Sequence, residues 1–421
     1  MIGFENKDSL LYALLKNDIW TLFIEEKVAA GHINKWEEKE FRTFVESGEY
    51  LDAAKKLISN LNVGYPRKIF INKMNSDKKR IVYSFQGADN YLLKLITWLM
   101  KKYDGAFSSN CYAFRKNRSI QNVCSRLCKI PELEEKYALK IDIQNYFNSI
   151  PVDRLVEKMK KVVCDDLMLQ KFLENLLTQN KVYINGTLTE ENRGAMAGCP
   201  LGGFFANLYL TDLDNYFAAE GIPYFRYSDD IIFFTDSKDE QEKYERILIE
   251  KVEEEGLFVN QKKSIKTSPG ELWDFLGISY KNGEFDLSSF TVAKIKRKIA
   301  KRARGLYVWK SRKDASFEKV AGILIRDFNN LFFGESLSQE SDEEERIFSW
   351  ERWYFPVITT SKSLEIVDRY LQEYIRYLYS GRHYKGNYKI TYENIKALGY
   401  KSLVNNYYKK ENFLVPVNYN I

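Results

Sequence analysis

Two adjacent carboxylates inside an apolar run are the feature that most constrains how this chain folds. Asp229 and Asp230 lie between two strand-like runs, residues 223–226 and 231–235. This pattern predicts a β-hairpin that carries both acids at its tip. Two carboxylates so close together repel each other in a half-buried turn, so both stay ionised only beside a cation. Hard oxygen ligands of this kind suit Mg²⁺.

A second acidic pair in the same chain provides a comparison. Asp165 and Asp166 are followed by the helix formers Leu167, Met168 and Leu169. A carboxylate directly before such a run is typical of a helix start. We therefore expect this pair to begin a solvated helix and not to bind metal.

A further lone carboxylate follows an apolar run. Asp142 comes directly after residues 139–141 and immediately before a predicted turn. A buried Asp at such a place often caps the turn. Two separate strands that each present a carboxylate would, however, supply the oxygen ligands that two metal ions need. The predicted ligands of two Mg²⁺ ions are the side chains of Asp142, Asp229 and Asp230 and the backbone carbonyl of Ile143.

Composition narrows the class of protein. The chain has 421 residues, of which 45% are hydrophobic, so it is long enough for several packed units. Only two histidines are present, which argues against sites built from several histidines, such as those of zinc hydrolases. The five cysteines are odd in number and lack paired spacing, which argues against a disulfide framework. No stretch is apolar enough to span a membrane and the N-terminus lacks signal-peptide features, so we expect a cytoplasmic protein without a membrane partner.

The pattern along the chain predicts an α+β fold in three parts. Residues 1–62 are rich in helix formers with recurring apolar positions, which indicates a helical N-terminal extension. Residues 63–288 alternate strand-like runs with helical stretches, and the catalytic domain should lie here. Residues 289–421 return to helical periodicity.

The third part begins with a strongly basic segment. Residues 291–313 contain ten Lys or Arg and no acid, while apolar residues recur at spacings of three and four. This pattern predicts a helix with one packed face and one cationic face. Such a helix suits the phosphates of a nucleic acid, although a membrane surface or a partner helix would also fit. The predicted nucleic-acid contacts are Lys294, Arg297, Lys298, Lys301, Arg302 and Arg304.

In order, spacing and flanking hydrophobicity, Asp142 and the box at residues 227–230 resemble the first and third palm motifs of reverse transcriptases. The resemblance covers roughly residues 65–310. It implies a right-hand polymerase fold, with fingers and palm in residues 63–288 and a helical thumb and RNA-binding region in residues 289–421. It also implies DNA synthesis with two Mg²⁺ ions. In such enzymes the fifth residue after the first Asp is a bulky steric gate, here Phe147, which implies a preference for deoxynucleotides.

Two segments near the start of that region resemble the fingers of the same family. Lys73 and Arg80 look like the two cations that grip the triphosphate of the incoming nucleotide. An exposed basic hairpin is the alternative explanation. Arg115, within residues 112–119, resembles an Arg that touches template or nucleotide.

The second palm motif departs from the family pattern. Residues 194–209 keep its frame, but Ala197 stands at the usual Gln position and Gly202 and Gly203 stand at Ser-Pro. The resemblance places Ala197 and Gly198 at the nucleotide, and glycines there would let the backbone approach it closely. A plain turn before a helix explains one glycine equally well. Contact with the templating base is less secure without the Gln.

Two later segments resemble the fourth motif and the primer grip. Lys263 matches the Lys that is considered the general acid for pyrophosphate, and an exposed surface lysine is the alternative. Phe275, Leu276 and Gly277 resemble the hairpin that positions the 3′ end of the primer.

The C-terminal residues 392–408 resemble the end of prokaryotic defence-associated reverse transcriptases. This likeness implies a bacterial antiphage enzyme, with the type 2 class, which copies a companion non-coding RNA, among the candidates. The implied partners are an RNA template, the cDNA product and dNTPs. Basic and aromatic residues alternate just before this segment, which suits stacking on unpaired RNA, while ordinary core packing explains about half of the aromatics. These residues are Arg376, Tyr377, Tyr379, Arg382, Tyr384, Lys385 and Tyr388.

Two alternatives stay open from the sequence. The altered second motif is compatible with a template-independent or protein-primed DNA synthase of the abortive-infection type. A protein of a different class, an RNA-binding scaffold with an inactive polymerase fold, would not need its carboxylates, which are all present here. A group II intron maturase fits less well because such proteins usually need a longer chain.

Overall fold

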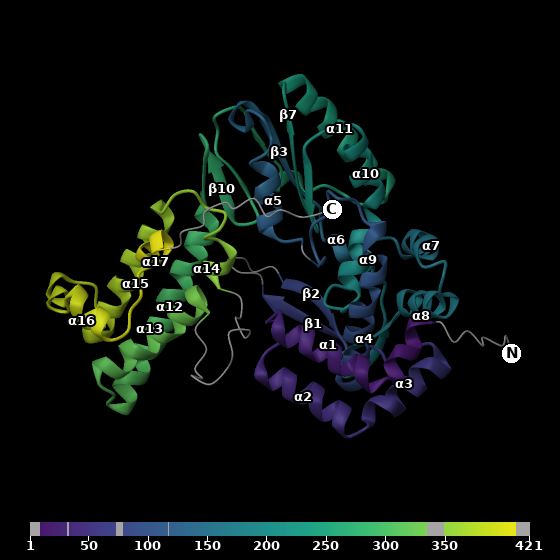
Figure 1. Cartoon of the computed structure of the whole chain (residues 1–421), viewed down its shortest axis with the longest axis horizontal. Coiled ribbons are helices and arrows are strands. Elements are labelled where there is room, and N and C mark those ends of the chain that lie inside the picture. The colour runs from purple at the N-terminus through teal and green to yellow at the C-terminus, as the bar shows by residue number, and fades with distance from the viewer. Residues whose placement is uncertain (1–8, 32, 73–78, 117, 335–348, 410–421) are drawn as a thin grey trace. The chain divides into compact units, whose positions relative to one another are not determined.

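The computed structural model divides into two compact units, each of which is described by itself. The residues that the structure describes are 9–31, 33–72, 79–116, 118–334 and 349–409. Unit 1 comprises residues 1–28, 32–119 and 136–266, and unit 2 comprises residues 29–31, 120–135 and 267–421. In Figure 1, most of unit 1 is coloured purple to teal and most of unit 2 green to yellow.

Unit 1 begins with helices whose apolar faces enter its main core. Trp20, Phe23 and Phe41 are fully buried and belong to the same cluster as Leu139 of strand β3 (Tyr137–Asp142). The segment that the sequence suggested as an N-terminal extension therefore packs as part of unit 1. Its elements are η1 (Leu10–Leu15), α1 (Asn17–Ala29), α2 (Lys35–Glu46) and α3 (Glu49–Asn60).

A four-stranded sheet with the order β2-β1-β4-β5 follows these helices. β1 (Arg67–Asn72) pairs antiparallel with β2 (Lys79–Ser84), and β4 (Lys181–Ile184) pairs antiparallel with β5 (Thr187–Glu190). Asn185 and Gly186 between β4 and β5 both have positive φ angles, as a two-residue hairpin turn requires. After β2 the chain continues into α4 (Gly87–Leu99) and η2 (Met100–Ala106).

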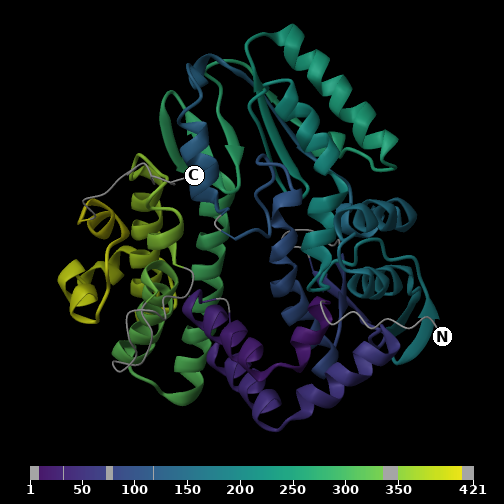
Figure 2. The same cartoon turned by 45° about the vertical axis from the view of Figure 1, so that its right-hand side comes forward.

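The second sheet of unit 1 carries the acidic residues and has the order β6-β7-β3-β8. β7 (Asp230–Thr235) lies between β6 (Tyr224–Tyr227) and β3 (Tyr137–Asp142) and pairs antiparallel with both. Its residues 231–234 are fully buried, which explains an uninterrupted apolar run instead of strict alternation. The helices α10 (Thr211–Ala219) and α11 (Lys238–Glu254) lie along this sheet (Figures 1 and 2). β8 is Ile265–Thr267.

The remaining elements of unit 1 are helical. They are α6 (Tyr146–Ser149), α7 (Val152–Val162), α8 (Leu167–Thr178), α9 (Gly202–Tyr209) and η4 (Gln261–Lys263). As predicted, Asp166 starts a helix, because its side chain accepts a hydrogen bond from the backbone N of Leu169 at 2.9 Å. The prediction that this acid is solvated was wrong. Asp166 is only 4% exposed, because the N-terminal segment docks on it through Ser9 Oγ at 3.0 Å and Leu10 N at 2.8 Å.

Unit 2 joins a small antiparallel sheet to a helical bundle. The sheet has the order β11-β10-β9, with β9 (Trp273–Phe275), β10 (Ile278–Lys281) and β11 (Glu284–Leu287). The predicted basic helix is α12 (Ser289–Lys313), which Ser288 caps by accepting a hydrogen bond from Thr291 N. As predicted, its apolar stripe is buried. The other elements are α5 (Ile120–Leu127), η3 (Leu133–Glu135), α13 (Phe317–Phe333), α14 (Trp350–Trp353), α15 (Lys362–Ser380), η5 (Lys385–Lys389), α16 (Tyr392–Ala397) and α17 (Leu403–Lys409).

The mixture of antiparallel sheets and helices confirms the predicted α+β class. Among the described residues, none of the helices combines the length and the apolar character that crossing a membrane would take.

Candidate active site

The strand register of the second sheet brings the predicted carboxylates together. Asp142 at the end of β3 pairs directly with Asp230 at the start of β7. Residues opposite each other in antiparallel strands project to the same face with Cβ atoms about 4.5–5.5 Å apart. Tyr227 and Asp230 also form a pair, so Ser228 and Asp229 make a two-residue turn between β6 and β7. All three acids therefore lie at one end of this sheet.

The turn itself is pinned by the backbone. Ser228 has a φ of 63°, the left-handed conformation that a tight hairpin needs at this position. The backbone N of Ile143 donates a hydrogen bond to the carbonyl of Asp229 at 3.2 Å. Asp229 is thus tied to the residue that follows Asp142.

A buried ion pair that the sequence analysis did not predict is hydrogen-bonded to this turn. Arg226 and Asp214 are both 0% exposed and form a two-point pair, with Nε to Oδ1 at 2.7 Å and Nη2 to Oδ2 at 2.5 Å. The guanidinium also donates to the carbonyls of Ser228 at 3.3 Å and Asn207 at 3.1 Å. An Arg inside an otherwise apolar strand was the signal for this pair, but its partner on α10 was not visible.

Asp142 has two further polar neighbours. The ammonium of Lys263 lies 2.8 Å from both carboxylate oxygens of Asp142. Asn260 donates its side-chain amide to Asp142 Oδ2 at 3.2 Å and its backbone N to the carbonyl of Asp142 at 2.7 Å. The structure therefore brings the predicted Lys263 to the site, and it adds Asn260, which the sequence reasoning did not single out.

The electrostatics of the acids suit a cation. Burial raises the pKa of Asp229, and burial raises the pKa of Asp230 to about 6, with repulsion between the neighbouring carboxylates adding to both. The charged forms are therefore disfavoured together unless positive charge is near. Carboxylate and carbonyl oxygens are the donors that Mg²⁺ prefers, so the predicted ligands Asp142, Ile143, Asp229 and Asp230 fit that ion chemically. Within the described ranges, no set of three His, Cys, Asp or Glu side chains has the spacing of a preformed metal site.

The predicted steric gate contacts a second aromatic ring. Phe147, in α6, meets Phe114 edge to face, with ring centroids 6.0 Å apart and an interplanar angle of 85°. Phe114 is 60% exposed and has a φ of 58°, an uncommon conformation for a bulky residue. A Cβ at Gly203 would lie 2.6 Å from Cγ of Phe114, so this ring requires a glycine beside it. The family resemblance of residues 112–119 assigns a role to Arg115 and none to Phe114.

The glycine-rich loop is held against neighbouring segments by hydrogen bonds and close contacts, while Gly198 itself is exposed. Ala197 donates its backbone N to the side-chain oxygen of Asn148 at 3.0 Å, and its carbonyl accepts a hydrogen bond from Tyr83 N at 2.7 Å. Gly198 has a φ of 94°, and a Cβ there would lie 2.1 Å from Cγ1 of Val82. The close backbone approach at Gly198 is therefore to strand β2, and the contact of Ala197 and Gly198 with a nucleotide stays a prediction.

Arg115 also differs from its predicted role. Its side chain is 5% exposed and pairs with Asp104, with Nε to Oδ1 and Nη2 to Oδ2 both at 2.9 Å. Its remaining N–H groups donate to the carbonyls of Asp104, Ser108 and Cys111. All five donors are used inside unit 1, so we assign Arg115 a structural role in place of the predicted contact with template or nucleotide.

Of the two side chains predicted to bind the triphosphate, the structure describes only Arg80. Arg80 is exposed on β2, where it pairs with Ile71 of β1. Lys73 lies outside the described residues.

In unit 2, the residues predicted as the primer grip form a hairpin tip. Phe275 pairs with Ile278, and between them Leu276 and Gly277 have φ angles of 53° and 85°. The carbonyl of Gly277 accepts hydrogen bonds from Ser288 N and Thr291 Oγ1, both at 2.9 Å. The tip is therefore tied to the start of α12.

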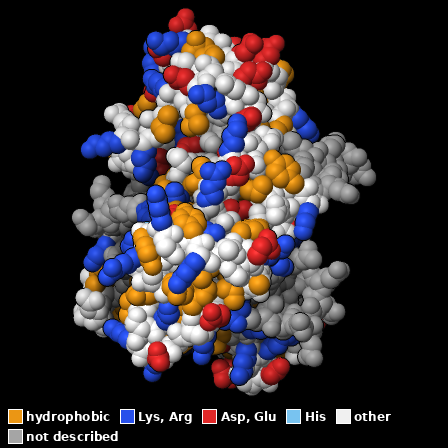
Figure 3. Space-filling model, turned by 90° about the vertical axis from the view of Figure 1, so that its left-hand side faces the viewer, with side chains coloured by type: hydrophobic (Ala, Val, Ile, Leu, Met, Phe, Trp, Pro, Cys, Tyr) orange, Lys and Arg blue, Asp and Glu red, His pale blue; other side chains and the backbone are white. Residues whose placement is uncertain are grey.

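The cationic face of α12 is largely free of carboxylates. Of the predicted contacts, Arg302 forms an ion pair with Asp327 at 2.6 Å within the described part of the chain. Figure 3 shows one face of the protein, on which Lys and Arg side chains lie among exposed hydrophobic groups. The predicted contacts that are exposed are Lys294, Lys298, Lys301, Arg302 and Arg304, and Arg297 is partly exposed.

The aromatic and basic residues around η5 are partly exposed. Tyr388 is 65% exposed and lies against Arg376, whose guanidinium carbon is 5.0 Å from the ring centroid. Tyr379 is 38% exposed and has Lys389 4.0 Å from its ring centroid. Tyr377, in contrast, packs against the core of unit 2.

Comparison with known proteins adds to this geometry. A family model for reverse transcriptase (RNA-dependent DNA polymerase) matches residues 71–280. The retron Ec86 reverse transcriptase of Escherichia coli is 24% identical over 208 residues, which are 48% of this chain and 59% of that relative. This chain thus spans less than two thirds of that relative's length.

Solved structures give a weaker likeness. Apo telomerase from Candida tropicalis matches with a TM-score of 0.44 and 12% identity, covering 92% of this chain and 86% of that chain. The same telomerase truncated from its C-terminal domain matches with a TM-score of 0.42 and 15% identity, covering 54% and 55%. Likeness at this level supports no functional argument. The sequence match does: residues 71–280 match the reverse transcriptase family model, and the α+β architecture is that of the family's right-hand polymerase fold.

Proposed function

We propose that this chain is an RNA-directed DNA polymerase whose catalytic carboxylates are Asp142, Asp229 and Asp230. The observation that carries the proposal is the β3–β7 register, which sets Asp142 opposite Asp230 and next to the turn with Asp229. Two carboxylate-bearing strands at one sheet end match the requirement for placing a divalent cation beside a nucleotide. The match of residues 71–280 to the reverse transcriptase family supports this function.

The proposed cofactor is a pair of Mg²⁺ ions, held by the three carboxylates and the carbonyl of Ile143. When bound, such ions neutralise the charge of the triphosphate and activate the primer hydroxyl. The fit rests on the half-buried carboxylates of Asp229 and Asp230, whose raised pKa values favour a nearby cation.

The surrounding residues have separate proposed roles. Phe147 excludes a ribose 2′-hydroxyl and so selects deoxynucleotides. Lys263, already 2.8 Å from Asp142, donates a proton to the leaving pyrophosphate. Lys73 and Arg80 bind the triphosphate, while the hairpin at residues 275–277 positions the primer end. The exposed cations of α12 bind the phosphates of the template–primer duplex.

The proposed template is a companion non-coding RNA, copied into cDNA in a bacterial antiphage response. Two observations support it: the likeness of residues 392–408 to defence-associated enzymes, and a bacterial retron reverse transcriptase among the relatives. Exposed tyrosines beside basic side chains around η5 suit stacking on unpaired RNA bases. Sequencing the nucleic acid that copurifies with the protein tests this, since a single structured RNA and its DNA copy are expected.

Primer extension on an RNA template tests the activity. The wild-type protein should incorporate dNTPs only when Mg²⁺ is present, and Asp229→Asn should lower the rate more than about a hundredfold. Asp239→Asn is the matched control, because Asp239 is an exposed acid in the first turn of α11. Full activity of Asp229→Asn would exclude the proposed catalytic site.

A second candidate function is template-independent or protein-primed DNA synthesis. It is favoured by Ala197, whose methyl group cannot donate a hydrogen bond as the usual Gln does. Sequencing the product separates the two functions. A copy of the added RNA supports the main proposal, whereas a random or homopolymeric DNA attached to a tyrosine supports the alternative.

A further inference from the structure

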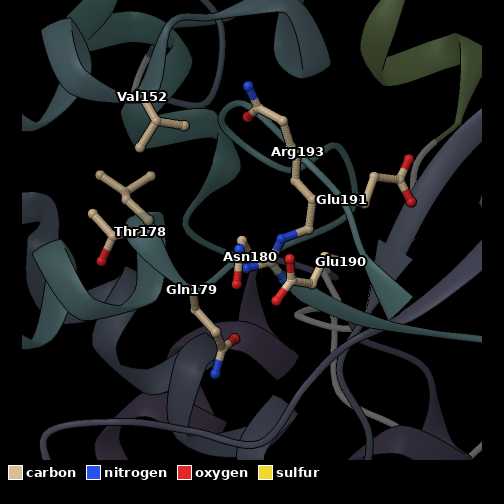
Figure 4. Close-up of a pocket in the computed structure, with 9 residues that line it drawn as sticks. Val152, Thr178, Gln179, Asn180, Glu190, Glu191 and Arg193 are labelled. Atoms are coloured by element: carbon tan, nitrogen blue, oxygen red, sulfur yellow. The ribbon is translucent and has the colours of Figure 1, made fainter. Parts of the chain in front are cut away.

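Unit 1 contains a second concave site that shares no residue with the carboxylates. A pocket of about 330 Å³ lies between the end of α8 and the end of the β4–β5 hairpin. Val152 and Leu177 supply apolar lining, and Arg193 extends into the pocket beside Asn180 (Figure 4). The other lining residues are Thr178, Gln179, Glu190, Glu191 and Asn192.

The charge of Arg193 is buried without a partner. Arg193 is 3% exposed, and neither Nη atom has a hydrogen-bond partner in the described part of the chain. Burial lowers the pKa of this guanidinium. Buried polar groups in folded proteins are nearly always hydrogen-bonded, and a buried charge is costly unless it is paired. The arrangement therefore calls for an additional group that presents hydrogen-bond acceptors to Arg193.

Two acids and a glutamine also line this pocket, and Glu191 Oε2 and Gln179 Oε1 likewise lack a hydrogen-bond partner among the described residues. Glu191 uses Oε1 to accept hydrogen bonds from Lys68 Nζ at 2.6 Å and Tyr83 Oη at 3.1 Å. Figure 4 shows its carboxylate on the side away from the Arg193 guanidinium. Glu190 is exposed and lies opposite Lys181 in the hairpin register. Neither acid forms an ion pair with Arg193 within the described residues.

The geometry of a guanidinium restricts the chemistry of the missing group. Its N–H groups form a planar fork that matches two oxygens of one phosphate or carboxylate. The side-chain amides of Asn180 and Asn192 stand at the exposed edge of the same pocket, where they can donate to further oxygens. The apolar lining by Val152 and Leu177 suits a sugar or another weakly polar portion next to that anion.

We propose that this pocket binds a phosphate group of a single-stranded nucleic acid through Arg193. The choice of phosphate over carboxylate rests on the proposed polymerase function, which supplies phosphate-bearing strands and nucleotides. The pocket is connected to the nucleotide gate, because the carbonyl of Arg193 accepts a hydrogen bond from Met196 N at 3.1 Å and Ala195 N donates to the carbonyl of Phe147 at 2.7 Å. A strand held here is anchored one short loop away from Phe147.

The test compares Arg193→Met with the wild-type protein, both in EDTA so that no synthesis takes place. Fluorescence anisotropy with an oligouridine RNA measures strand binding, and thermal unfolding with inorganic phosphate, against chloride at equal ionic strength, measures binding of the free anion. Loss of one charge-assisted contact should weaken RNA binding about tenfold and abolish the phosphate-dependent rise in Tm. Arg193→Lys should restore part of the RNA binding and part of the phosphate-dependent rise in Tm, because lysine carries the positive charge but lacks the planar two-donor geometry of a guanidinium.

Arg115→Met is the matched control for folding. Both arginines are buried in unit 1, but Arg115 is fully paired, so its loss should lower Tm, whereas Arg193→Met should leave Tm unchanged or raise it without ligand. Unchanged RNA and phosphate binding in Arg193→Met would overturn the proposal. If only the phosphate effect is lost, a free phosphate ester is the ligand and the assignment to a strand is wrong. Because binding is measured without turnover, an inactive polymerase site would not produce any of these results.

Discussion

At the scale of single residues, the turn that carries Asp229 is hydrogen-bonded to the buried side chain of Arg226. Arg226 holds Asp214 through two hydrogen bonds and also donates to the carbonyl of Ser228, the first residue of the turn. Breaking one partner of such a pair leaves the other charge buried, which is far more costly than replacing both by apolar groups. The position of Asp229 and Asp230 is thus linked to an ion pair that touches neither.

Arg226→Met should lower the stability of the protein by about 3–5 kcal/mol, because Asp214 is left without its partner. The double variant Arg226→Met Asp214→Leu should recover most of that stability but little polymerase activity, since Ser228 has still lost its donor. Urea unfolding and primer extension measure the two effects. Arg246→Met, at an exposed position of α11, is the control. If the single and the double variant lost the same amount of stability, the proposed role of the Arg226–Asp214 pair would be wrong.

The raised pKa of Asp230 makes metal-free stability depend on pH. Burial raises the pKa of Asp230 in the folded state to about 6, above the ordinary value of an aspartate. Protonation of Asp230 therefore stabilises the folded state fully at low pH, and this stabilisation is lost as the pH rises through about 6. In EDTA at pH 8, Asp230→Asn should therefore be more stable than the wild type by roughly 1–3 kcal/mol. The difference should shrink towards pH 5.

Magnesium should reverse that order. Thermal unfolding with added Mg²⁺ should raise Tm of the wild type, because ligand binding stabilises the folded state, and should raise Tm of Asp230→Asn much less. A variant that responds to Mg²⁺ as the wild type does would show that Asp230 is not a ligand.

Phe114 is expected to act on sugar selection through Phe147. It packs edge to face against the predicted gate in a strained left-handed conformation, and such strain tends to occur at functional sites. Phe114→Ala should lower the preference for dNTPs over rNTPs about tenfold, chiefly through a lower KM for rNTPs. Phe147→Ala should lower it further. Trp36→Ala, which removes a 68% exposed aromatic of α2, should have no effect on the ratio.

At the scale of elements, the loop before α9 links the gate to the fingers strand β2. Its backbone bonds to Tyr83 on one side and to Phe147 on the other. The glycines that permit this contact reach Val82, Phe114 and the backbone of Asn148. Strand β2 and Phe147 are therefore joined through this loop by backbone hydrogen bonds.

The helix α12 carries the charge that the proposed duplex needs. Replacing Lys294, Lys298 and Lys301 by Ala should weaken binding of a template–primer duplex at every sequence and reduce the slope of log Kd against log salt by about 0.9 per lost phosphate contact. Arg302→Ala should have a smaller effect, because Arg302 already pairs with Asp327. Anisotropy titrations over a series of salt concentrations measure both. An unchanged slope in the triple variant would exclude α12 from the phosphate contacts.

At the scale of the whole molecule, the N-terminal helices share one core with the catalytic sheet. Trp20 and Phe41 lie in the same buried cluster as Ile141 and Ile231, and Asp166, the residue before α8, accepts a hydrogen bond from Ser9 Oγ. The chain therefore divides between unit 1 and unit 2 and not after the N-terminal helices. The helices before residue 62 and the sheet after it share this buried cluster.

Deleting residues 1–62 should therefore unfold unit 1 instead of leaving an intact polymerase domain. The deletion exposes the apolar partners of α1, α2 and α3, among them Leu92 and Ile96, and each large buried side chain contributes about 1.5–3 kcal/mol. Solubility and far-ultraviolet circular dichroism of the truncated protein measure the result. A soluble, folded and active truncation would show that these helices are a separable extension.

What the sequence determined by itself was local. The acidic turn at Asp229 and Asp230, the buried stripe of α12 and the α+β class all follow from periodicity and turn residues, which act over a few positions. Tertiary structure decided the pairing of Asp142 with Asp230, the burial of Asp166, and the partners of Arg226 and Arg115. It also left Arg193 unpaired in its pocket. An arginine looks the same in a sequence whether its donors meet a carboxylate, a carbonyl or an open pocket, because those partners arrive from distant segments that only the folded chain brings together.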